Sequence, residues 1–234
     1  MNEFFNRHAA SLLPQRVLGP LGWLRGSVGA GLAIAVAGSL TALLLNGQAP
    51  GLPWLVAPLG ASAVLVFAVP ASPLAQPWSV VGGNLISATI GLALGLGLQD
   101  QLVAASLAVG LAIAVMTFAR CLHPPGGASA LLCALGAAGP EGWNFIHLVP
   151  ITANVIALAS AGWVYNNLTG HHWPHIIVPA VPDAASSNST HTRADIEATL
   201  SEWDEMLDVD VDDLDAFFRA VTERVKARGN ASRG

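Results

Sequence analysis

Long apolar runs, separated by short polar or proline-containing breaks, fill the chain from residue 27 to residue 168. A helix that crosses a membrane needs about 20 mostly apolar residues. Six stretches reach or approach that length, and each is predicted to be a helix: Ser27–Asn46, Trp54–Pro70, Ser79–Leu98, Leu102–Ala119, Gly126–Ala138 and Trp143–Leu168. The pattern therefore predicts an all-α, polytopic membrane protein.

Two of the six segments are short. Trp54–Pro70 falls slightly below the length of a span, and Gly126–Ala138 is either a short fifth span or a re-entrant half-helix. A chain with five spans would place its acidic tail outside the cell and leave Arg120 unexplained. We therefore expect six transmembrane or half-helical segments.

The distribution of charge supports a membrane domain and orients it. Only 11% of the 234 residues are charged, against about 25% in soluble domains. Between Gly26 and Pro182 the charged residues are Asp100, Arg120 and Glu141. Arginine and lysine gather on the cytoplasmic side of membrane proteins. With six segments both termini are cytoplasmic, and so are these arginines: Arg7, Arg16, Arg25, Arg120 and Arg193.

Four regions follow from the pattern. Residues 1–26 form an amphipathic cytoplasmic segment, residues 27–170 a transmembrane domain, residues 171–191 a linker, and residues 192–228 a cytoplasmic helical tail. Within the tail, apolar residues recur at helical spacing in two stretches, Thr192–Leu207 and Val211–Val225.

The tail is acidic, because the chain from Asp183 onward carries 12 acidic and 6 basic residues. Its two amphipathic helices must pack on each other, on a partner chain or on the membrane surface. An acidic surface disfavours anionic lipid, so a protein partner is the favoured reading.

Composition also argues against several classes of protein. No basic patch favours nucleic acid. Cys121 and Cys133 lie twelve residues apart in apolar sequence, without a disulfide framework or a zinc spacing. The chain has no nucleophile paired with a base, no paired carboxylates and no phosphate loop, so we expect neither an enzyme nor a cofactor.

Two patterns resemble metal sites and then depart from them. In His171-His172-x-x-His175, the intervening Trp173-Pro174 breaks any shared helical face, so an interfacial cluster is favoured over a metal site. Asp208-x-Asp210-x-Asp212 begins like a calcium loop, but aspartate replaces glycine at its sixth position and arginine replaces glutamate at its twelfth. We expect no bound metal.

The apolar region repeats itself. Gly31–Val36 recurs as Gly110–Val115. Pro58–Leu65 reappears 67 positions later as Pro125–Leu132, and both copies contain Gly-Ala-Ser-Ala. Three segments in each repeat (about 27–98 and 102–168) reverse the orientation of the second copy. Inverted repeats with interrupted helices form midplane binding sites in many transporters.

The paired proline-started elements are candidate anion sites. A helix start presents free N–H groups and the positive end of its dipole, and the serine hydroxyls add donors. Asn84 and Asn154 occupy corresponding places in the third and sixth segments. The candidate substrate-binding residues are Pro58, Gly60, Ala61, Ser62, Asn84, His123, Pro125, Gly126, Gly127, Ala128, Ser129 and Asn154. Close packing by small residues, and interhelical hydrogen bonding by the asparagines, remain the structural alternatives.

Arg120 and His123 stand at the break before the second element. One reading makes them an anion attractor and a titratable gate at the cytoplasmic mouth. The other is structural: Arg120 obeys the positive-inside rule and reaches the headgroups, and the His123 ring binds backbone.

At His123–Ala130 the sequence resembles the HPP family of integral membrane proteins, named for the tripeptide His-Pro-Pro. The resemblance extends to Pro58–Ala63, Phe67–Pro77 and Val81–Asn84, and it covers residues 20–170. It implies transport of nitrite, because relatives in cyanobacteria and plant plastids are associated with that activity. Many bacterial relatives carry a pair of CBS domains, which is not recognised here.

The resulting expectation is a multi-pass transporter of a small monovalent anion in a bacterial inner membrane, with nitrite favoured over other anions. A homo-oligomer, such as a dimer, is expected. An anion channel is one alternative. The other is a membrane anchor or sensor whose repeated core only positions the tail for a partner.

Overall fold

The computed structural model describes residues 22–46, 51–98, 100–175, 191–202 and 211–231. Within these ranges the chain forms eight α-helices and two short 3-10 turns, and no strand. It divides into two compact units, Met1–Pro174 and His175–Gly234, which we describe separately. The predicted all-α class is confirmed. Residues 1–21 of the predicted N-terminal amphipathic segment fall outside the described ranges. Residues 22–26 were also assigned to that segment, which is wrong, because they form the first turn and more of the helix that was expected to begin at Ser27.

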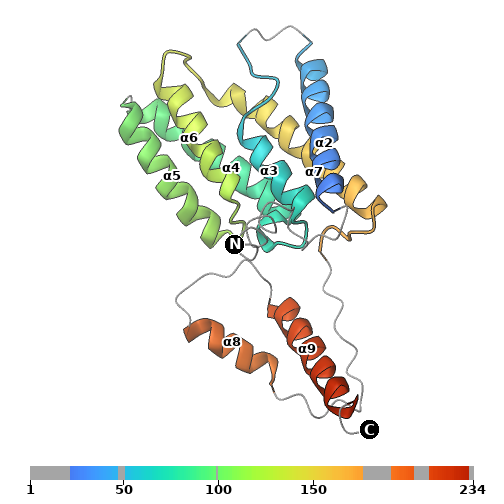
Figure 1. Cartoon of the computed structure of the whole chain (residues 1–234). Helices are drawn as coiled ribbons and strands as arrows, with labels where there is room; N and C mark the ends of the chain where they lie inside the picture. The colour runs from blue at the N-terminus through green and yellow to red at the C-terminus, as the bar shows by residue number, and fades with distance from the viewer. Residues whose placement is uncertain (1–21, 47–50, 99, 176–190, 203–210, 232–234) are drawn as a thin grey trace, which may run out of the picture. The chain divides into compact units, whose positions relative to one another are not determined.

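Each of the six predicted apolar segments overlaps one helix of the first unit, and four of these helices begin before the predicted start. These helices are α2 (Gly22–Leu45), α3 (Pro58–Ala68), α4 (Pro77–Leu98), α5 (Gln101–Phe118), α6 (Pro124–Ala138) and α7 (Leu148–Leu168), and Figure 1 shows that successive helices alternate in direction. Four candidate spans are long and apolar enough to cross a membrane: α2, α4, α5, and α7 with the turn before it.

The other two helices are too short to span. At 1.5 Å per residue the 11 residues of α3 extend about 16 Å and the 15 residues of α6 about 22 Å, against a hydrocarbon core of about 30 Å. The prediction of one nearly full-length helix over Trp54–Pro70 is therefore wrong. Pro58 lacks the N–H that an interior position must donate, so the helix begins at that residue.

The start of α7 also differs from the prediction. Residues before Leu148 form a 3-10 turn, η3 (Phe145–His147), which is held by the Asn144 side chain accepting from the Ile146 N–H at 3.0 Å. The Trp143 N–H donates to the Gly136 carbonyl at 2.9 Å, and its ring stacks on His147. These contacts fold the segment back onto α6 and delay the helix.

Small residues bring α4 and α6 into close contact. A Cβ built on Gly91 would lie 2.3 Å from the Ala130 carbonyl oxygen, and one on Gly95 would lie 2.6 Å from the Ala134 carbonyl oxygen. Glycine spaced by four residues on one helix face allows such backbone approach in membranes. The α4–α6 contact is therefore set by glycines that have no room for a side chain.

Arg25 joins the start of α2 to the ends of α3 and α7. Its guanidinium donates to Asn166 Oδ1 at 2.8 Å and to the Phe67 carbonyl at 2.9 Å. The Tyr165 hydroxyl donates in return to the Arg25 carbonyl at 2.9 Å. The first and last helices of the unit thus meet at one end of it.

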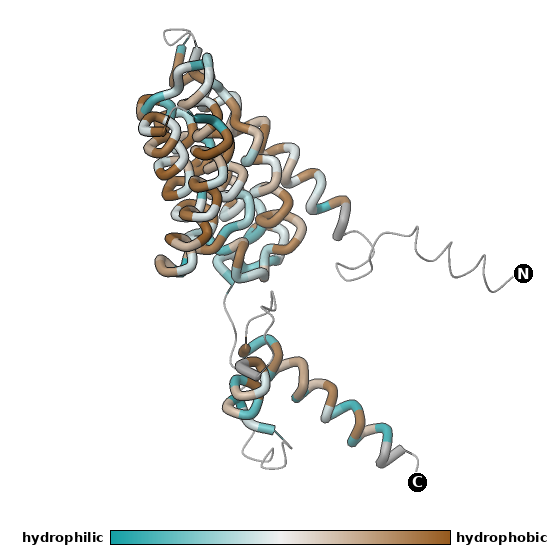
Figure 2. Tube along the Cα trace, turned by 90° about the vertical axis from the view of Figure 1, so that its left-hand side faces the viewer, coloured by the Kyte–Doolittle hydropathy of each residue, from teal (hydrophilic) through white to brown (hydrophobic). Residues whose placement is uncertain are grey.

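Hydrophobic residues predominate along the helices of the first unit, as the colour of the tube in Figure 2 shows, and many of their large side chains are exposed. Large hydrophobic side chains there include Leu43, Leu102, Phe118 and Leu168, which are 72%, 77%, 89% and 81% exposed. Such a surface is stable against lipid rather than water. The chain is therefore a membrane protein with several apolar helices.

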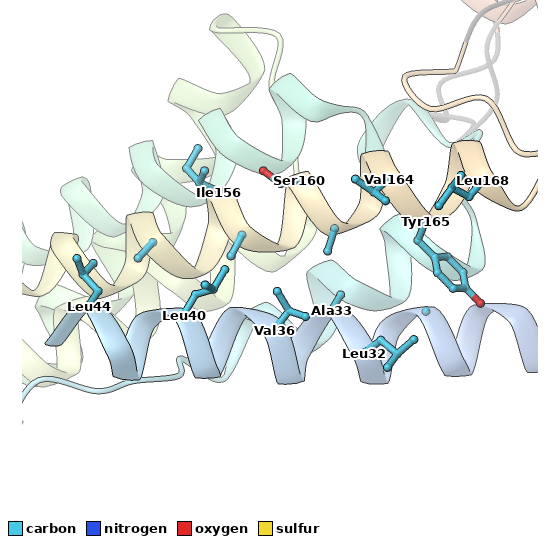
Figure 3. A pocket seen from close by; sticks show the side chains of 14 residues that line it. Leu32, Ala33, Val36, Leu40, Leu44, Ile156, Ser160, Val164, Tyr165 and Leu168 are labelled. Atoms are coloured by element: carbon cyan, nitrogen blue, oxygen red, sulfur yellow. The ribbon is translucent and has the colours of Figure 1, made fainter. Parts of the chain in front are cut away.

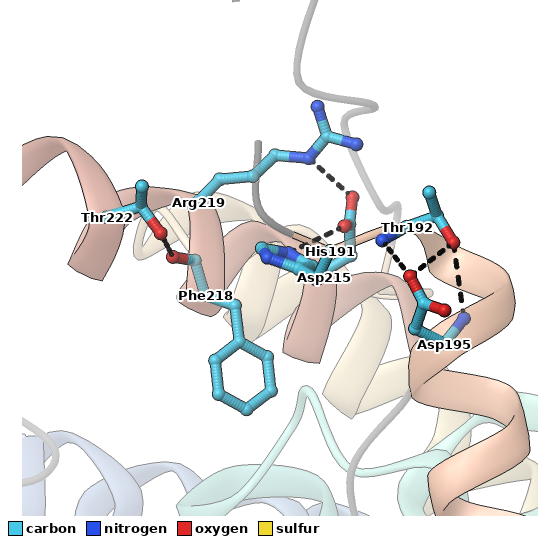
Figure 4. Close-up of polar contacts among 7 residues, drawn as sticks. All are labelled: His191, Thr192, Asp195, Asp215, Phe218, Arg219 and Thr222. Carbon is cyan, nitrogen blue, oxygen red and sulfur yellow. Dashed lines mark hydrogen bonds and ion pairs between the residues drawn. The ribbon is translucent and has the colours of Figure 1, made fainter. Parts of the chain in front are cut away.

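The second unit contains α8 (Arg193–Glu202) and α9 (Val211–Ala231), which pack on each other. Thr192 and Asp195 exchange hydrogen bonds at the start of α8 (Figure 4). The two bonds from Thr192 lower the pKa of the Asp195 carboxyl. The predicted continuation of the first tail helix to Leu207 lies outside the described residues, and α9 runs six residues past the predicted end at Val225.

Candidate functional site

Four polar side chains meet inside the apolar first unit. Ser62 comes from the first turns of α3, Asn84 from the middle of α4, His123 from the residue that precedes α6, and Ser129 from α6 itself. All four are buried, with exposures between 0% and 3%. The two serines belong to the two copies of the repeated element, so the fold brings those copies together.

Hydrogen bonds connect the four side chains in series. Ser129 Oγ donates to Asn84 Oδ1 at 2.7 Å, and Asn84 Nδ2 donates to Ser62 Oγ at 3.1 Å. Ser62 Oγ lies 2.8 Å from His123 Nε2, and His123 Nδ1 lies 2.8 Å from the Leu74 carbonyl oxygen. We call Ser62, Asn84, His123 and Ser129 the polar network.

The partners fix the positions of the protons. A carbonyl oxygen only accepts, so His123 Nδ1 carries the hydrogen and donates to Leu74. In the neutral ring Nε2 is then an acceptor, and it receives the hydroxyl hydrogen of Ser62. With the ring neutral, the network carries no charge and each of its hydroxyls donates to a protein atom. An anion can bind only if some of these hydroxyls turn toward it.

Close backbone packing positions His123. It is extended, with φ −142°, at the residue before Pro124, and the chain reaches it through Arg120, which has φ +53°. A Cβ on Gly83 would lie 2.5 Å from the Cβ of His123 and 2.8 Å from the Cys121 carbonyl oxygen. Gly83 thus lets the break between α5 and α6 lie directly on α4. Neither Gly83 nor the Leu74 carbonyl was among the predicted site residues.

The predicted backbone donors are not free at the helix starts. Pro58 and Pro125 have no N–H, the Gly60 N–H donates to the Ala57 carbonyl at 3.1 Å, and the Gly126 N–H donates to the His123 carbonyl at 2.7 Å. The donors of the polar network are therefore hydroxyl and amide groups of side chains.

The small residues of the two elements lie mostly away from the network. Gly60, Ala61 and Ala128 are exposed and Gly127 is half-buried. Gly126 is buried, and a Cβ there would lie 2.9 Å from the Gly83 carbonyl oxygen, so close packing accounts for it.

Asn154 lies apart from the polar network. Its Nδ2 donates to Thr41 Oγ1 at 2.6 Å and to the Trp54 carbonyl at 3.1 Å, and its Oδ1 accepts from the Val56 N–H at 3.2 Å. It therefore ties α7 to α2 and to the segment before α3, and the structure does not bring it together with Asn84.

Arg120 is exposed at the end of α5. The preceding residue accepts a hydrogen bond from the Trp78 indole at 3.0 Å, which places this end of α5 beside the start of α4. Arg120 therefore lies at one end of the unit, outside the polar network.

An apolar groove runs between α2 and α7 (Figure 3). It has a volume of about 690 Å³ and is lined by Leu32, Val36, Leu40, Ile156 and Val164 among others, with Ser160 and Tyr165 as its polar side chains. Hydrocarbon suits such a lining, whereas a small anion would lose its hydration there without gaining donors. The groove is therefore no candidate for the anion.

Among the residues that the structure describes, no three His, Cys, Asp or Glu side chains gather in a way that could hold a metal ion. His171 and His172 are exposed, and His175 lies 3.2 Å from Asp213 within the second unit.

Similar proteins identify the family. The family model described as the transmembrane region of HPP matches residues 15–174. Two transmembrane proteins of Dictyostelium discoideum are 41% and 38% identical to the chain over 118 residues, which is 48% and 49% of this chain. The match covers 41% of the length of the first relative and 38% of the second, so the chain spans less than half of each. No solved structure matches it. Because the family model covers most of the sequence, the chain belongs to the HPP transmembrane family.

Proposed function

We propose that the protein transports a small monovalent anion, with nitrite as the favoured substrate, and that the polar network is where the anion binds. The observation that carries this proposal is the meeting of Ser62 and Ser129 through one amide. Polar side chains inside a membrane domain are costly and mark solute pathways more often than chance. The choice of nitrite rests on the resemblance to relatives associated with its transport.

The chemistry of the network suits a weakly hydrated monovalent anion. Two hydroxyls and one amide can donate hydrogen bonds, and no carboxylate lies in the network to repel negative charge. Without a fixed cation the site would bind one negative charge weakly enough to release it.

The closed state of the network implies a conformational change. Ser62, Asn84 and Ser129 are buried and bonded to one another. In the proposed cycle, α3 or α6 moves relative to α4 and opens the network to one side of the membrane at a time. The short helices are the natural moving parts, since they make up less of the span than α4 does.

We also propose that α2–α4 and α5–α7 are inverted repeats. Exchanging the two sets preserves the pattern of neighbours: α2 packs on α3 as α5 packs on α6, and α2 packs on α7 as α5 packs on α4. In each set a short helix that starts with proline stands between two long ones. The polar network lies where the two short helices approach α4.

The charges favour cytoplasmic termini in the inner membrane. Arg25 bonds to the end of α3, and Arg120 follows the residue that contacts the start of α4, so both lie at one end of the unit. Asp100 and Glu141 lie at the opposite end, in the loops after α4 and α6. By the positive-inside rule the arginine-bearing end faces the cytoplasm.

The direct test is uptake of nitrite by liposomes that contain the purified protein, with nitrate, formate and chloride as competitors. We expect saturable uptake, and a reduction of about tenfold or more in uptake at low substrate for Ser62→Ala and Ser129→Ala, because a hydrogen bond to a charged group contributes about 1.5–3 kcal/mol. Ser106→Ala is the matched control, since Ser106 is exposed on α5.

The outcomes separate the alternatives. Rapid flux without saturation would indicate a channel. No flux of any of the four anions, from protein shown to be folded, would contradict the proposal and favour a membrane anchor whose tail binds a partner.

A second test concerns His123. Protonation would turn Nε2 into a donor, and the Ser62 hydroxyl hydrogen would lose its acceptor and become available to an anion. We therefore expect the KM for nitrite to fall as the pH is lowered. His123→Gln should abolish this dependence, and protein-free liposomes correct for passive entry of the protonated acid. An unchanged pH profile in His123→Gln would remove His123 from the coupling step.

A further inference from the structure

Helix α9 carries an apolar stripe that is only partly covered by the other residues that the structure describes in the second unit. Phe217, Phe218, Val221 and Val225 are 62%, 45%, 41% and 51% exposed. Phe217 and Phe218 are adjacent, and Val221 and Val225 follow at intervals of three or four residues, so all four lie within about 100° of the helix circumference. A soluble helix seldom leaves four large apolar side chains of one face in water.

Helix α8 covers only one side of this stripe. Leu214 and Phe218 line a groove of about 340 Å³ against Ile196 and Leu200 of α8. On the same side, Asp215 is paired with His191 at 3.4 Å and with Arg219 at 2.7 Å (Figure 4). The side that carries Phe217, Val221 and Val225 is the open one.

The two ends of α9 carry opposite charges, while Arg219 and Glu223 between them pair within the helix, with Asp215 and Lys226. Asp212, Asp213 and Asp215 stand in its first five residues, whereas Arg224, Lys226 and Arg228 stand in its last eight. At 100° per residue, Asp213 and Arg224 fall on the same flank of the apolar stripe, the flank beside Phe217. Asp213 keeps 36% of its side chain exposed while it pairs with His175.

We propose that α9 of one copy pairs in antiparallel orientation with α9 of a second copy. In an antiparallel pair, the side of the helix that carries Asp213 and Arg224 lies next to the same side of the second copy. The two helices run in opposite directions, so the start of one lies beside the end of the other. Setting Phe217 against the Val221 of a second copy then brings Asp213 beside the second copy's Arg224, and the twofold relation repeats both contacts. Apolar and charged groups both match in this register.

The same helix does not fit a parallel pair. Side by side in parallel, the acidic starts of the two copies would meet each other and so would the basic ends, which repel. In the antiparallel pair the twofold axis is perpendicular to the helices, and each contact between one copy and the other is repeated by it. A second copy is therefore the occupant that the charges of α9 itself specify.

The orientation can be tested by cross-linking like-numbered cysteines in the full-length protein in lipid nanodiscs that hold two copies. The twofold axis of this register passes near residue 219. At 1.5 Å per residue, Ala220 and its counterpart are then about 3 Å apart along the helix axis, and Ala227 and its counterpart about 24 Å. Both alanines are exposed. We expect Ala220→Cys to cross-link with a short reagent and Ala227→Cys to remain uncross-linked.

Charge reversal provides the second measurement. In the Ala220→Cys background, Asp213→Arg or Arg224→Asp alone should abolish most of the cross-link, and the two together should restore it. The unsubstituted chain is the control, because its cysteines, Cys121 and Cys133, are buried.

Each other outcome overturns the proposal. Cross-links at both positions indicate a parallel pair. Cross-links at neither, or single reversals without effect, leave the stripe to a different protein or to the membrane surface. None of these results depends on anion uptake, so the interface and the proposed transport function can fail separately.

Discussion

Replacing Gly91 by alanine is expected to destabilise the membrane domain by about 1–3 kcal/mol, the usual cost of overpacking, whereas the same change at Gly97 is expected to cost nothing. The new Cβ at Gly91 would lie 2.3 Å from the Ala130 carbonyl oxygen and 2.8 Å from the Cβ of Cys133. The obstacle at Gly91 is backbone, which cannot rotate away. At Gly97, in the same helix, nothing lies within 4 Å of the added atom.

The measurement is the thermal unfolding of both variants in the same detergent, with the fraction of monodisperse protein recorded as the temperature is raised. The pair controls for helix propensity, because glycine becomes alanine in α4 in both proteins. Equal unfolding temperatures for the two variants would mean that α4 and α6 do not approach as closely as the structure places them.

Asn84→Ala is expected to abolish anion uptake, while Asn154→Ala is expected to retain uptake in the protein that folds. Both asparagines are buried and each makes three hydrogen bonds through its side chain. Both changes leave buried polar groups unpaired, at about 1–3 kcal/mol each, so their effects on stability should be similar. Only Asn84 contacts Ser62 and Ser129.

Uptake should therefore be normalised to the amount of folded protein in the liposomes. A comparable loss of uptake in both variants would indicate that the asparagines act through stability alone. In that case the polar network would be a structural element rather than an anion site.

The sequence predicts the long helices well, because their ends are marked by proline or by polar residues. The fourth segment, for example, was expected to begin at Leu102, and α5 begins at Gln101, where Asp100 caps it by accepting from the Val103 N–H at 2.9 Å. Apolar length alone misleads where a turn is itself apolar. Residues 143–147 and 54–57 read as membrane helix, yet the bonds of Asn144 and Asn154 hold them in other conformations.

The sequence indicated which residues belong to the candidate site, but not how their side chains are arranged. The repeat and the polar character of the residues pointed to Ser62, Asn84, His123 and Ser129. Their arrangement depends on a contact between elements far apart in sequence, the packing of Gly83 on His123. A glycine in an apolar helix gives no sign of which neighbour it admits. For the same reason, Asn154 could not be separated from Asn84 before its partners were known.

The hydrogen bonds of Arg25 bear on how the two halves of the membrane domain, residues 22–98 and residues 100–174, associate. One covalent link, residues 99–100 between α4 and α5, joins the two halves of the domain. The halves also pack on each other without that link: α4 packs on α5 and α6, and α2 packs on α7, where Arg25 and Tyr165 add hydrogen bonds. Two fragments cut at that link are therefore expected to associate through these packed helix faces.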